Sequence, residues 1–362
     1  MLLTDWLSLL ARNRFRVHPT KFGLAATVTA AAFFNTKMRL VQTAVLGRKI
    51  ATTPLGDDPV FILGHWRSGT TYLHELLRLD RNFVTPTTYQ CFSPNHFLLT
   101  EALVTRLLWF LVPEKRPMDN VAAGWNEPQE DEFALCALGL PSPYLRMAFP
   151  NSSPRHLEYL NMRGIGDDEL ARWKQQLQYF LRCLAVRSPG RVVLKSPTHT
   201  GRIAMLARLF PTAKFIHITR DPYVIFPSTM RLWSSLDDAQ SLQVPDHSDL
   251  QEYVLQCFEI MYQGFHEGLT QVDPRRVHHI RYEDLVADPV TVLCQTYEHL
   301  ELGSFQDLRA AVEAAVQTKA DYQTNRYQLP AELEAIISAR WHDYIARYNY
   351  CREPSRVQAA HQ

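Results

Sequence analysis

Residues 61–77 read Phe-Ile-Leu-Gly-His-Trp-Arg-Ser-Gly-Thr-Thr-Tyr-Leu-His-Glu-Leu-Leu, and they hold the clearest structural signal in the chain. The apolar run from Val60 to Leu63 predicts a buried strand, and residues 72–79 predict a helix. A short loop with Gly64 and Gly69 lies between them. The first N–H groups of a helix have no partner within the helix and point at one spot, so this arrangement forms a cradle for an anion.

The loop carries its positive charge in an unusual place. The spacing Gly-x-x-x-x-Gly is that of the phosphate loop of nucleotide triphosphatases, in which a lysine follows the second glycine. Here Thr70 occupies that position, and the cation lies inside the loop at Arg67. Ser68, Thr70 and Thr71 add hydroxyl donors. The sequence therefore predicts a site for a phosphate-like anion other than the triphosphate of ATP.

The pattern beyond the loop predicts one α/β domain with a central parallel sheet. Strand signals recur at 191–194, 214–218 and 277–281. Helical patterns recur at 1–48, 200–209, 250–269, 290–300, 305–316 and 331–348. A strand–helix–strand order implies neighbouring parallel strands joined by a right-handed crossover. We therefore expect an N-terminal helical extension over 1–51 and a single domain over 52–362, which contains a helical insertion over 86–190 and ends in helices.

A second anion site is predicted where the strand at 214–218 ends. Arg220 follows that strand, Asp221 and Pro222 are typical of a helix start, and Ser228 lies eight positions after Arg220. Open α/β sheets bind ligands at the carboxyl ends of their strands. The guanidinium of Arg220 and the hydroxyl of Ser228 can converge there on one anion. An Arg–Asp pair with a structural role would explain the same turn equally well.

Taken together, these elements resemble the sulfotransferase family that uses 3′-phosphoadenosine 5′-phosphosulfate (PAPS). The loop is similar to that family's 5′-phosphosulfate loop, and Arg220 with Ser228 is similar to its 3′-phosphate motif. Residues 281–289, Arg-Tyr-Glu-Asp-Leu-Val-Ala-Asp-Pro, resemble a third motif whose tyrosine lies beside the adenine. The likeness spans residues 60–290. It implies a P-loop-like phosphate cradle, PAPS as the co-substrate without a metal, and in-line transfer of a sulfuryl group to a hydroxyl or amine.

The resemblance also implies roles for individual residues. Arg67 would neutralise the leaving phosphate, and Lys195, at the end of the second strand, would be another cation beside the sulfuryl oxygens. Arg326 would close over the 3′-phosphate, although an exposed loop arginine is an equally good interpretation. Tyr72 would stack on the adenine, unless it is a core aromatic. The other residues implied to bind the nucleotide are Ser68, Gly69, Thr70, Thr71, Arg220, Ser228 and Tyr282.

The general base is the least determined part of the site. His199 lies four residues after Lys195, whereas cytosolic family members place their histidine two residues after the corresponding lysine. An acidic run at 130–132 borders apolar residues and offers carboxylates for the same task. The candidates are therefore His199, Glu130, Asp131 and Glu132, followed by Glu127, His65 and His96.

Composition limits the remaining possibilities. The chain of 362 residues is 46% apolar and 21% charged, which is ordinary for a soluble globular protein. Its net charge of +1 gives no reason to expect a nucleic-acid partner. The six cysteines lie far apart without metal-ligand spacing, so we expect buried thiols in a reducing, cytoplasmic compartment.

The N-terminal segment leaves peripheral membrane contact open. Residues 23–34 form an apolar run of 12, whereas a membrane span needs about 20. No compact basic region precedes this run, which argues against a signal peptide. Leucines and a tryptophan within residues 2–10 can form one face of an amphipathic helix, which packs on its own domain or lies on a lipid surface.

Two other functions stay open beside the sulfotransferase. A P-loop kinase-like phosphotransferase using ATP and magnesium is disfavoured by Thr70 in the lysine position. A nucleotide-binding module without catalysis would lack the base. For the leading hypothesis we expect a small-molecule, carbohydrate or lipid acceptor. Its pocket is predicted in the insertion at 86–190, whose aromatic residues include Trp109, Trp125 and Tyr144.

Overall fold

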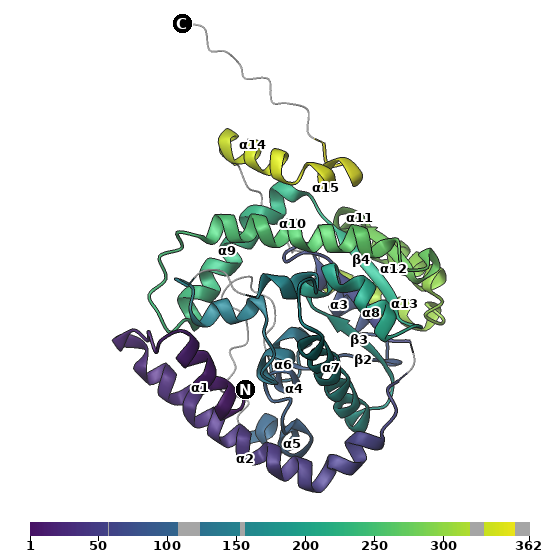
Figure 1. Cartoon of the computed structure of the whole chain (residues 1–362). Coiled ribbons are helices and arrows are strands. Elements are labelled where there is room, and N and C mark those ends of the chain that lie inside the picture. Colours follow the sequence, from purple (N-terminus) through teal and green to yellow (C-terminus); the bar gives the residue numbers. More distant parts are fainter. Residues whose placement is uncertain (57, 108–123, 153–155, 319–328, 352–362) are drawn as a thin grey trace, which may run out of the picture.

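The computed structural model describes the chain except residues 57, 108–123, 153–155, 319–328 and 352–362. Its centre is a parallel sheet of five strands in the order β2-β3-β1-β4-β5. These strands are β1 (Val60–Leu63), β2 (Phe83–Val84), β3 (Arg191–Lys195), β4 (Lys214–Thr219) and β5 (Val277–Arg281). Helices cover both faces of the sheet (Figure 1). The predicted α/β domain with a central parallel sheet is confirmed.

The central strand β1 is fully buried and pairs on both sides. Ile62 lies opposite Lys195 of β3 and opposite Ile216 of β4. A strand buried on both faces is apolar at every position, as this one is. The edge strand β2 has only two residues, too few for a pattern to be recognised in the sequence.

The helices fall into three groups along the chain. The N-terminal pair is α1 (Leu3–Arg12) and α2 (Phe22–Thr52). The helices up to β3 are α3 (Thr70–Leu77), α4 (Thr88–Phe92), α5 (Phe97–Leu107), α6 (Asp131–Ala137) and α7 (Asp167–Arg187). The later helices are α8 (Ile203–Leu209), α9 (Pro222–Gln240), α10 (Leu250–Leu269), α11 (Tyr282–Ala287), α12 (Pro289–Leu300), α13 (Gln306–Thr318), α14 (Ala331–Arg340) and α15 (His342–Arg347).

Short 3₁₀ turns connect several of these elements. They are η1 (Pro19–Lys21), η3 (Pro143–Ala148), η4 (Leu157–Leu160), η5 (Pro197–Arg202) and η6 (Pro274–Arg276). The helix predicted over 200–209 is therefore divided between η5 and α8. Close packing explains the tight turn, because a Cβ on Gly201 would lie 2.4 Å from the carbonyl oxygen of Leu160.

Two other helix predictions differ in detail. The helix after the loop begins at Thr70, two residues earlier than predicted, because Gly69 ends the turn in the left-handed region. The helix predicted over 331–348 divides into α14 and α15 around the buried Trp341. The helix predicted to start at Asp221 does so: the Asp221 side chain accepts a hydrogen bond from the Tyr223 N–H, and α9 continues through Pro227.

The N-terminal helices form a layer on the opposite side of the molecule from α14 and α15 (Figure 1). Trp6 of α1 is buried and donates its indole N–H to Thr29 of α2 at 2.8 Å. Gln42, farther along α2, is buried and donates to the Tyr179 hydroxyl of α7 at 2.9 Å. One side of α2 therefore packs on α1 and α7. In the described residues no helix is both long and apolar enough to cross a membrane.

The cysteines agree in part with the expectation of buried thiols. All six are free, and Cys91, Cys183 and Cys257 are buried. Cys136 and Cys294 are partly buried, whereas Cys351 is exposed.

Candidate active site

The loop after β1 depends on two glycines. Gly64 has φ of +154°, and a Cβ there would lie 2.7 Å from the carbonyl oxygen of Ile218. Gly69 has φ of +100°, and a Cβ there would lie 2.2 Å from a ring carbon of Tyr282. Only glycine combines these dihedral angles with such close neighbours. The loop is thereby held tightly between β4 and the start of α11, with the N-terminus of α3 directed into the site.

Arg67 connects the two predicted anion sites. Its backbone lies in the left-handed region at φ of +67°, an uncommon conformation for a non-glycine residue that tends to occur at functional sites. Its side-chain Nε donates to the Ser228 hydroxyl at 2.8 Å. Its carbonyl accepts a hydrogen bond from the Arg220 guanidinium, also at 2.8 Å. The loop arginine and both residues of the second motif therefore form one cluster.

Arg220 is held from several sides where β4 ends. Its guanidinium lies 4.1 Å from the ring centre of Tyr282, the first residue of α11. Its backbone N–H donates to the Tyr344 hydroxyl, which in turn donates to the Arg220 carbonyl, both at 3.0 Å. Tyr344 comes from α15, so a C-terminal helix stabilises this corner of the site. The sequence contained no signal for that contact.

Lys195 lies beside the loop because β3 is adjacent to β1. Its Nζ is 2.7 Å from Glu130 Oε1 and 3.4 Å from the Thr71 hydroxyl. The Lys195 side chain is 2% exposed, whereas that of Glu130 is 15% exposed. The arrangement therefore places a buried cation next to the predicted phosphate cradle and a carboxylate at the edge toward solvent.

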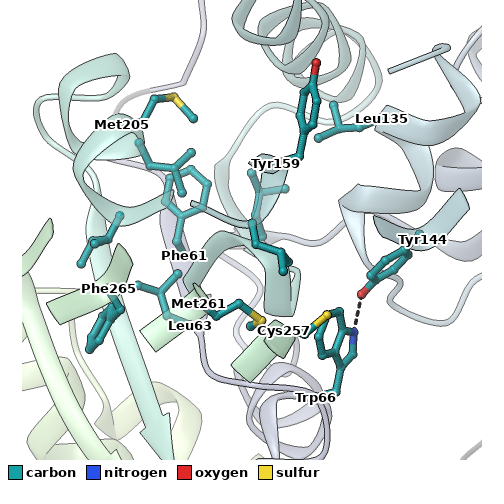
Figure 2. Packing of buried hydrophobic residues seen from close by; sticks show 14 of the residues in the cluster. Phe61, Leu63, Trp66, Leu135, Tyr144, Tyr159, Met205, Cys257, Met261 and Phe265 are labelled. Carbon is teal, nitrogen blue, oxygen red and sulfur yellow. Dashed lines mark hydrogen bonds between the residues drawn. The ribbon is translucent and has the colours of Figure 1, made fainter. Parts of the chain in front are cut away.

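Glu130 is held by a second set of contacts through Tyr144, which the sequence analysis expected only as an aromatic residue of the acceptor pocket. The Tyr144 hydroxyl donates to Glu130 Oε2 and accepts from the Trp66 indole N–H at 2.9 Å (Figure 2). Burial and the nearby Glu130 carboxylate raise the pKa of Tyr144 well above its usual value, so its proton stays on the phenol. The carboxylate of Glu130 is thus fixed between Tyr144 and Lys195.

The other two carboxylates of the acidic run are fully enclosed in the protein. Asp131 accepts from the His199 ring at 2.7 Å and from the Ser196 hydroxyl at 2.7 Å. Glu132 pairs with the buried Arg202 at 2.6 Å. Burial by itself would raise the pKa of both carboxyl groups, but His199 around Asp131 and Arg202 around Glu132 outweigh it and lower both pKa values.

This buried network stabilises the start of α6, where Glu130 is the N-cap residue. His199 and Arg202, which take part in this network, lie on η5. The Thr200 hydroxyl of η5 also accepts a hydrogen bond from the Gly64 N–H of the loop at 2.8 Å. His199 itself is fully buried, with its ring 5.5 Å from that of Phe61. These contacts favour a structural role for His199 and leave Glu130 as the carboxylate of the run that borders the site.

The remaining candidates are located elsewhere or have other contacts. His65 is buried beneath the loop, where burial lowers its pKa to about 3. His96 lies between α2 and α5, 2.8 Å from Asn35. Glu127 pairs with Arg78 on the surface at 2.6 Å.

Two other predictions concern the nucleotide and acceptor sites. Tyr72 is partly buried on α3, and its pKa is raised, first by burial and then by the neighbouring Tyr282. Arg326 and Trp109 lie outside the described residues.

Among the described residues, no group of three or more histidine, cysteine, aspartate or glutamate side chains is arranged to hold a metal ion. The cations at this site are supplied by protein side chains, namely Arg67, Lys195 and Arg220. Fold and site together define an α/β protein with a glycine-containing loop and a cluster of cationic side chains at the carboxyl edge of a parallel sheet, where such sheets bind ligands.

The chain belongs to the sulfotransferase family, because the family model described as "Sulfotransferase family" matches residues 59–307. A curated relative from Mycobacterium tuberculosis (strain CDC 1551 / Oshkosh) is 44% identical over 358 residues, which cover 98% of this chain and 92% of the relative. Its name is omega-hydroxy-beta-dihydromenaquinone-9 sulfotransferase Stf3, and the protein of that name from Mycobacterium bovis gives the same values. The chain is thus an enzyme, a transferase of sulfuryl groups.

Solved structures agree on the fold. Sulfotransferase STF9 from Mycobacterium avium superposes with a TM-score of 0.69 at 20% identity, covering 91% of this chain and 86% of that one. Sulfotransferase STF1 from Mycobacterium tuberculosis H37Rv superposes with a TM-score of 0.64 at 16% identity, covering 94% of this chain and 92% of that one. The kinase-like alternative therefore has no support from any of these comparisons.

Proposed function

We propose that this enzyme transfers a sulfuryl group from PAPS to the hydroxyl of a lipid-like acceptor, with Glu130 as the general base. The observation that carries the proposal is the convergence of Lys195, Thr71 and Glu130 beside the loop that contains Arg67. Cations beside a phosphate cradle suit the donor, and a partly exposed carboxylate next to them suits removal of a proton.

For the donor, we propose a division of labour between the two anion sites. The N–H groups of Gly69, Thr70 and Thr71, with the Ser68 and threonine hydroxyls and Arg67, bind the 5′-phosphosulfate. The 3′-phosphate lies at Arg220 and Ser228. The adenine lies near Tyr72 and Tyr282, and Arg326 is proposed to close over the nucleotide. The family relationship and the cluster of Arg67, Ser228 and Arg220 support this assignment.

For the chemistry, Glu130 takes the proton of the acceptor hydroxyl as its oxygen bonds to sulfur. The bond between sulfur and the 5′-phosphate oxygen breaks in line, and 3′,5′-bisphosphoadenosine leaves. Arg67 stabilises the charge on the leaving phosphate, and Lys195 stabilises the sulfuryl oxygens. Positioning and electrostatics account for most catalysis of this type in phosphoryl transfer, which sulfuryl transfer parallels. His199, buried against Asp131, acts through α6 by positioning Glu130.

For the acceptor, the aromatic residues next to Glu130 favour an apolar molecule. The ring of Tyr144 lies 5.2 Å from that of Phe133, which lies 5.2 Å from that of Phe92. Phe92 is 46% exposed, so this row of rings leads from the base to the surface. The relative Stf3 is named for a hydroxylated menaquinone, a lipid with a terminal hydroxyl. A lipid hydroxyl is therefore our proposed acceptor.

We also place the enzyme in the cytoplasm, with peripheral membrane contact through the N-terminal helices. Its free cysteines suit a reducing compartment. A lipid acceptor resides in the bilayer, so an enzyme that acts on it has to contact the membrane surface.

The test compares Glu130→Gln with Glu127→Gln, whose carboxylate pairs with Arg78 on the surface. Glu130→Gln should lower kcat by about 100- to 1000-fold, within the range of about 100- to 10,000-fold that general acid–base catalysis typically contributes. Calorimetric affinity for 3′,5′-bisphosphoadenosine should stay within about threefold, since the nucleotide sites are intact, and Glu127→Gln should behave as the parent chain. Normal turnover of Glu130→Gln would refute the base. Preference for ATP with magnesium over the bisphosphate would refute the donor.

A further inference from the structure

The N-terminal layer is charged differently from the rest of the molecule. Residues 1–56 contain eight Lys or Arg and one acidic residue, Asp5, so their net charge is 8 − 1 = +7. Residues 57–362 contain the other 30 basic and 36 acidic residues, so their net charge is −6. The near-neutral total thus conceals a strongly basic N-terminal layer and an acidic remainder.

The outer face of α2 is apolar, the reverse of an ordinary surface helix. This helix has 31 residues, none of them acidic. Its exposed positions form a broad band along the whole helix, on the side away from α1 and α7. Phe33 is 53% exposed, Leu40 64% and Val45 65%. The exposed charged side chains of this helix are all basic, namely Lys37, Arg48 and Lys49. The other side of α2 is the one that carries polar contacts, such as those of Thr29 with α1 and of Gln42 with α7.

A second helix extends this surface. The ring of His96, next to the start of α5, packs edge-on against Phe34 of α2 at 5.4 Å, and Figure 1 shows α5 beside α2. Along α5, Leu99, Leu103 and Leu107 are 37%, 63% and 59% exposed and lie four residues apart on one side. Single exposed apolar residues are normal, but a contiguous apolar surface of this kind marks an interaction site.

We propose that the outer faces of α2 and α5 bind the surface of an anionic lipid bilayer. Apolar side chains on a helix face combined with surrounding Lys and Arg are the features of helices that lie in the membrane interface. The charge of the layer is complementary to anionic headgroups, whereas a second copy of the same face would bring like charges together. This inference rests on the proposed function and deepens it. The helix before α5 is α4, which ends at Phe92, the exposed end of the row of rings that leads to Glu130.

The connection between this face and the site runs through hydrogen bonds of the described residues. The Tyr89 hydroxyl of α4 lies 2.7 Å from the Thr100 hydroxyl of α5. The N–H groups of Thr88 and Gln129 bond across to Glu127 and Pro86, which holds the start of α4 beside the segment leading to Glu130. A lipid hydroxyl leaving a bilayer at α5 would therefore enter on the acceptor side of the cradle.

The experiment is sedimentation of the full chain with vesicles of phosphatidylglycerol and phosphatidylcholine, or of phosphatidylcholine alone. The apolar variant is Phe33→Gln, Leu40→Gln and Val45→Gln together, and the basic variant is Lys37→Gln, Arg48→Gln and Lys49→Gln together. We expect the parent chain to bind the anionic vesicles, and each variant to bind at least about tenfold more weakly. Val286→Gln and Arg275→Gln, which change exposed side chains on other elements, are the matched controls and should bind as the parent does.

Two results would overturn the proposal. One is no binding to anionic vesicles by the parent chain. The other is a dimer in sedimentation velocity that the apolar variant dissolves, which would assign the face to a second copy. Titration with 3′,5′-bisphosphoadenosine in solution keeps the outcomes separate, because it tests the donor site without vesicles. Unchanged thermal unfolding of the variants would show that lost binding is not lost folding.

Discussion

Single residues at this site are constrained by backbone geometry as much as by chemistry. Gly69 ends the loop in the left-handed region, and the ring of Tyr282 leaves no room for a side chain there. Arg67, two positions earlier, adopts a left-handed backbone conformation although it is not a glycine. Its Nε and its carbonyl bind Ser228 and Arg220, so the surrounding contacts hold the strained conformation in place.

Gly69→Ala should weaken both folding and nucleotide binding. The new Cβ would meet Tyr282 at 2.2 Å, so the ring has to move from beneath Arg220. We expect a loss of about 1–3 kcal/mol in urea unfolding, as for overpacked sites, and a clear drop in calorimetric affinity for 3′,5′-bisphosphoadenosine. The control is Gly303→Ala. Gly303 has φ of +116° and no neighbouring atom within 4 Å of where a Cβ would lie, so this variant measures the cost of the backbone conformation without a steric contact. Equal losses in both variants would show that the contact with Tyr282 is unimportant.

Among the elements, η5 and the start of α6 act as one unit. Asp131 and Glu132 bind to Ser196, the N-cap residue of η5, and to His199 and Arg202 within η5. These two carboxylates thereby fix α6, whose N-cap residue is Glu130. An acidic run in sequence is ordinarily a solvated helix start. Here adjacent side chains point to different environments, so one carboxylate lies at the site and two are internal.

This network predicts a pH dependence of stability. The pKa values of Asp131 and Glu132 are lowered in the folded protein, so the unfolded chain binds more protons at acid pH. The stabilisation is complete above the ordinary pKa values, 3.8 for Asp131 and 4.5 for Glu132, and it is lost as pH falls through the lowered values. The free energy of unfolding in urea should therefore fall steeply below about pH 4.5.

The matching variant is Glu132→Gln, which should cost about 3–5 kcal/mol at pH 7 because Arg202 stays buried without its charged partner. Its decline in acid should be shallower than that of the parent chain. Glu332→Gln, at an exposed position of α14, serves as the control. A parent stability that is flat down to pH 3 would contradict the account even if Glu132→Gln fails to fold.

In the molecule as a whole, the proposed nucleotide site joins distant parts of the chain. The loop follows β1, Arg220 follows β4, Tyr282 follows β5 and Tyr344 belongs to α15. A ligand bound to all of them stabilises the folded state and has no site in the unfolded chain. Binding and global unfolding are therefore linked.

We expect 3′,5′-bisphosphoadenosine at 100 times its Kd to stabilise the fold by about 2.7 kcal/mol, which raises Tm by several degrees. Arg220→Ala should abolish most of that rise, because the bound 3′-phosphate loses its charged partner. Arg309→Ala, half-exposed on α13, should keep it. Differential scanning fluorimetry checks all three chains, and an undiminished rise in Arg220→Ala would make that arginine purely structural.

The strands β1, β3, β4 and β5, the glycine-containing loop after β1 and the family could all be predicted from the sequence alone. These are local properties: apolar strand runs, glycines required by backbone geometry and short motifs are all written in consecutive residues. Which carboxylate borders the site could be learned only from the structure, because Glu130, Asp131 and Glu132 look alike in sequence and differ in their partners Lys195, His199 and Arg202. The contacts of Tyr144 and Tyr344 were equally invisible, since they join residues far apart in the chain. The apolar face of α2 also needed the structure, because exposure is known only once the neighbouring helices have packed.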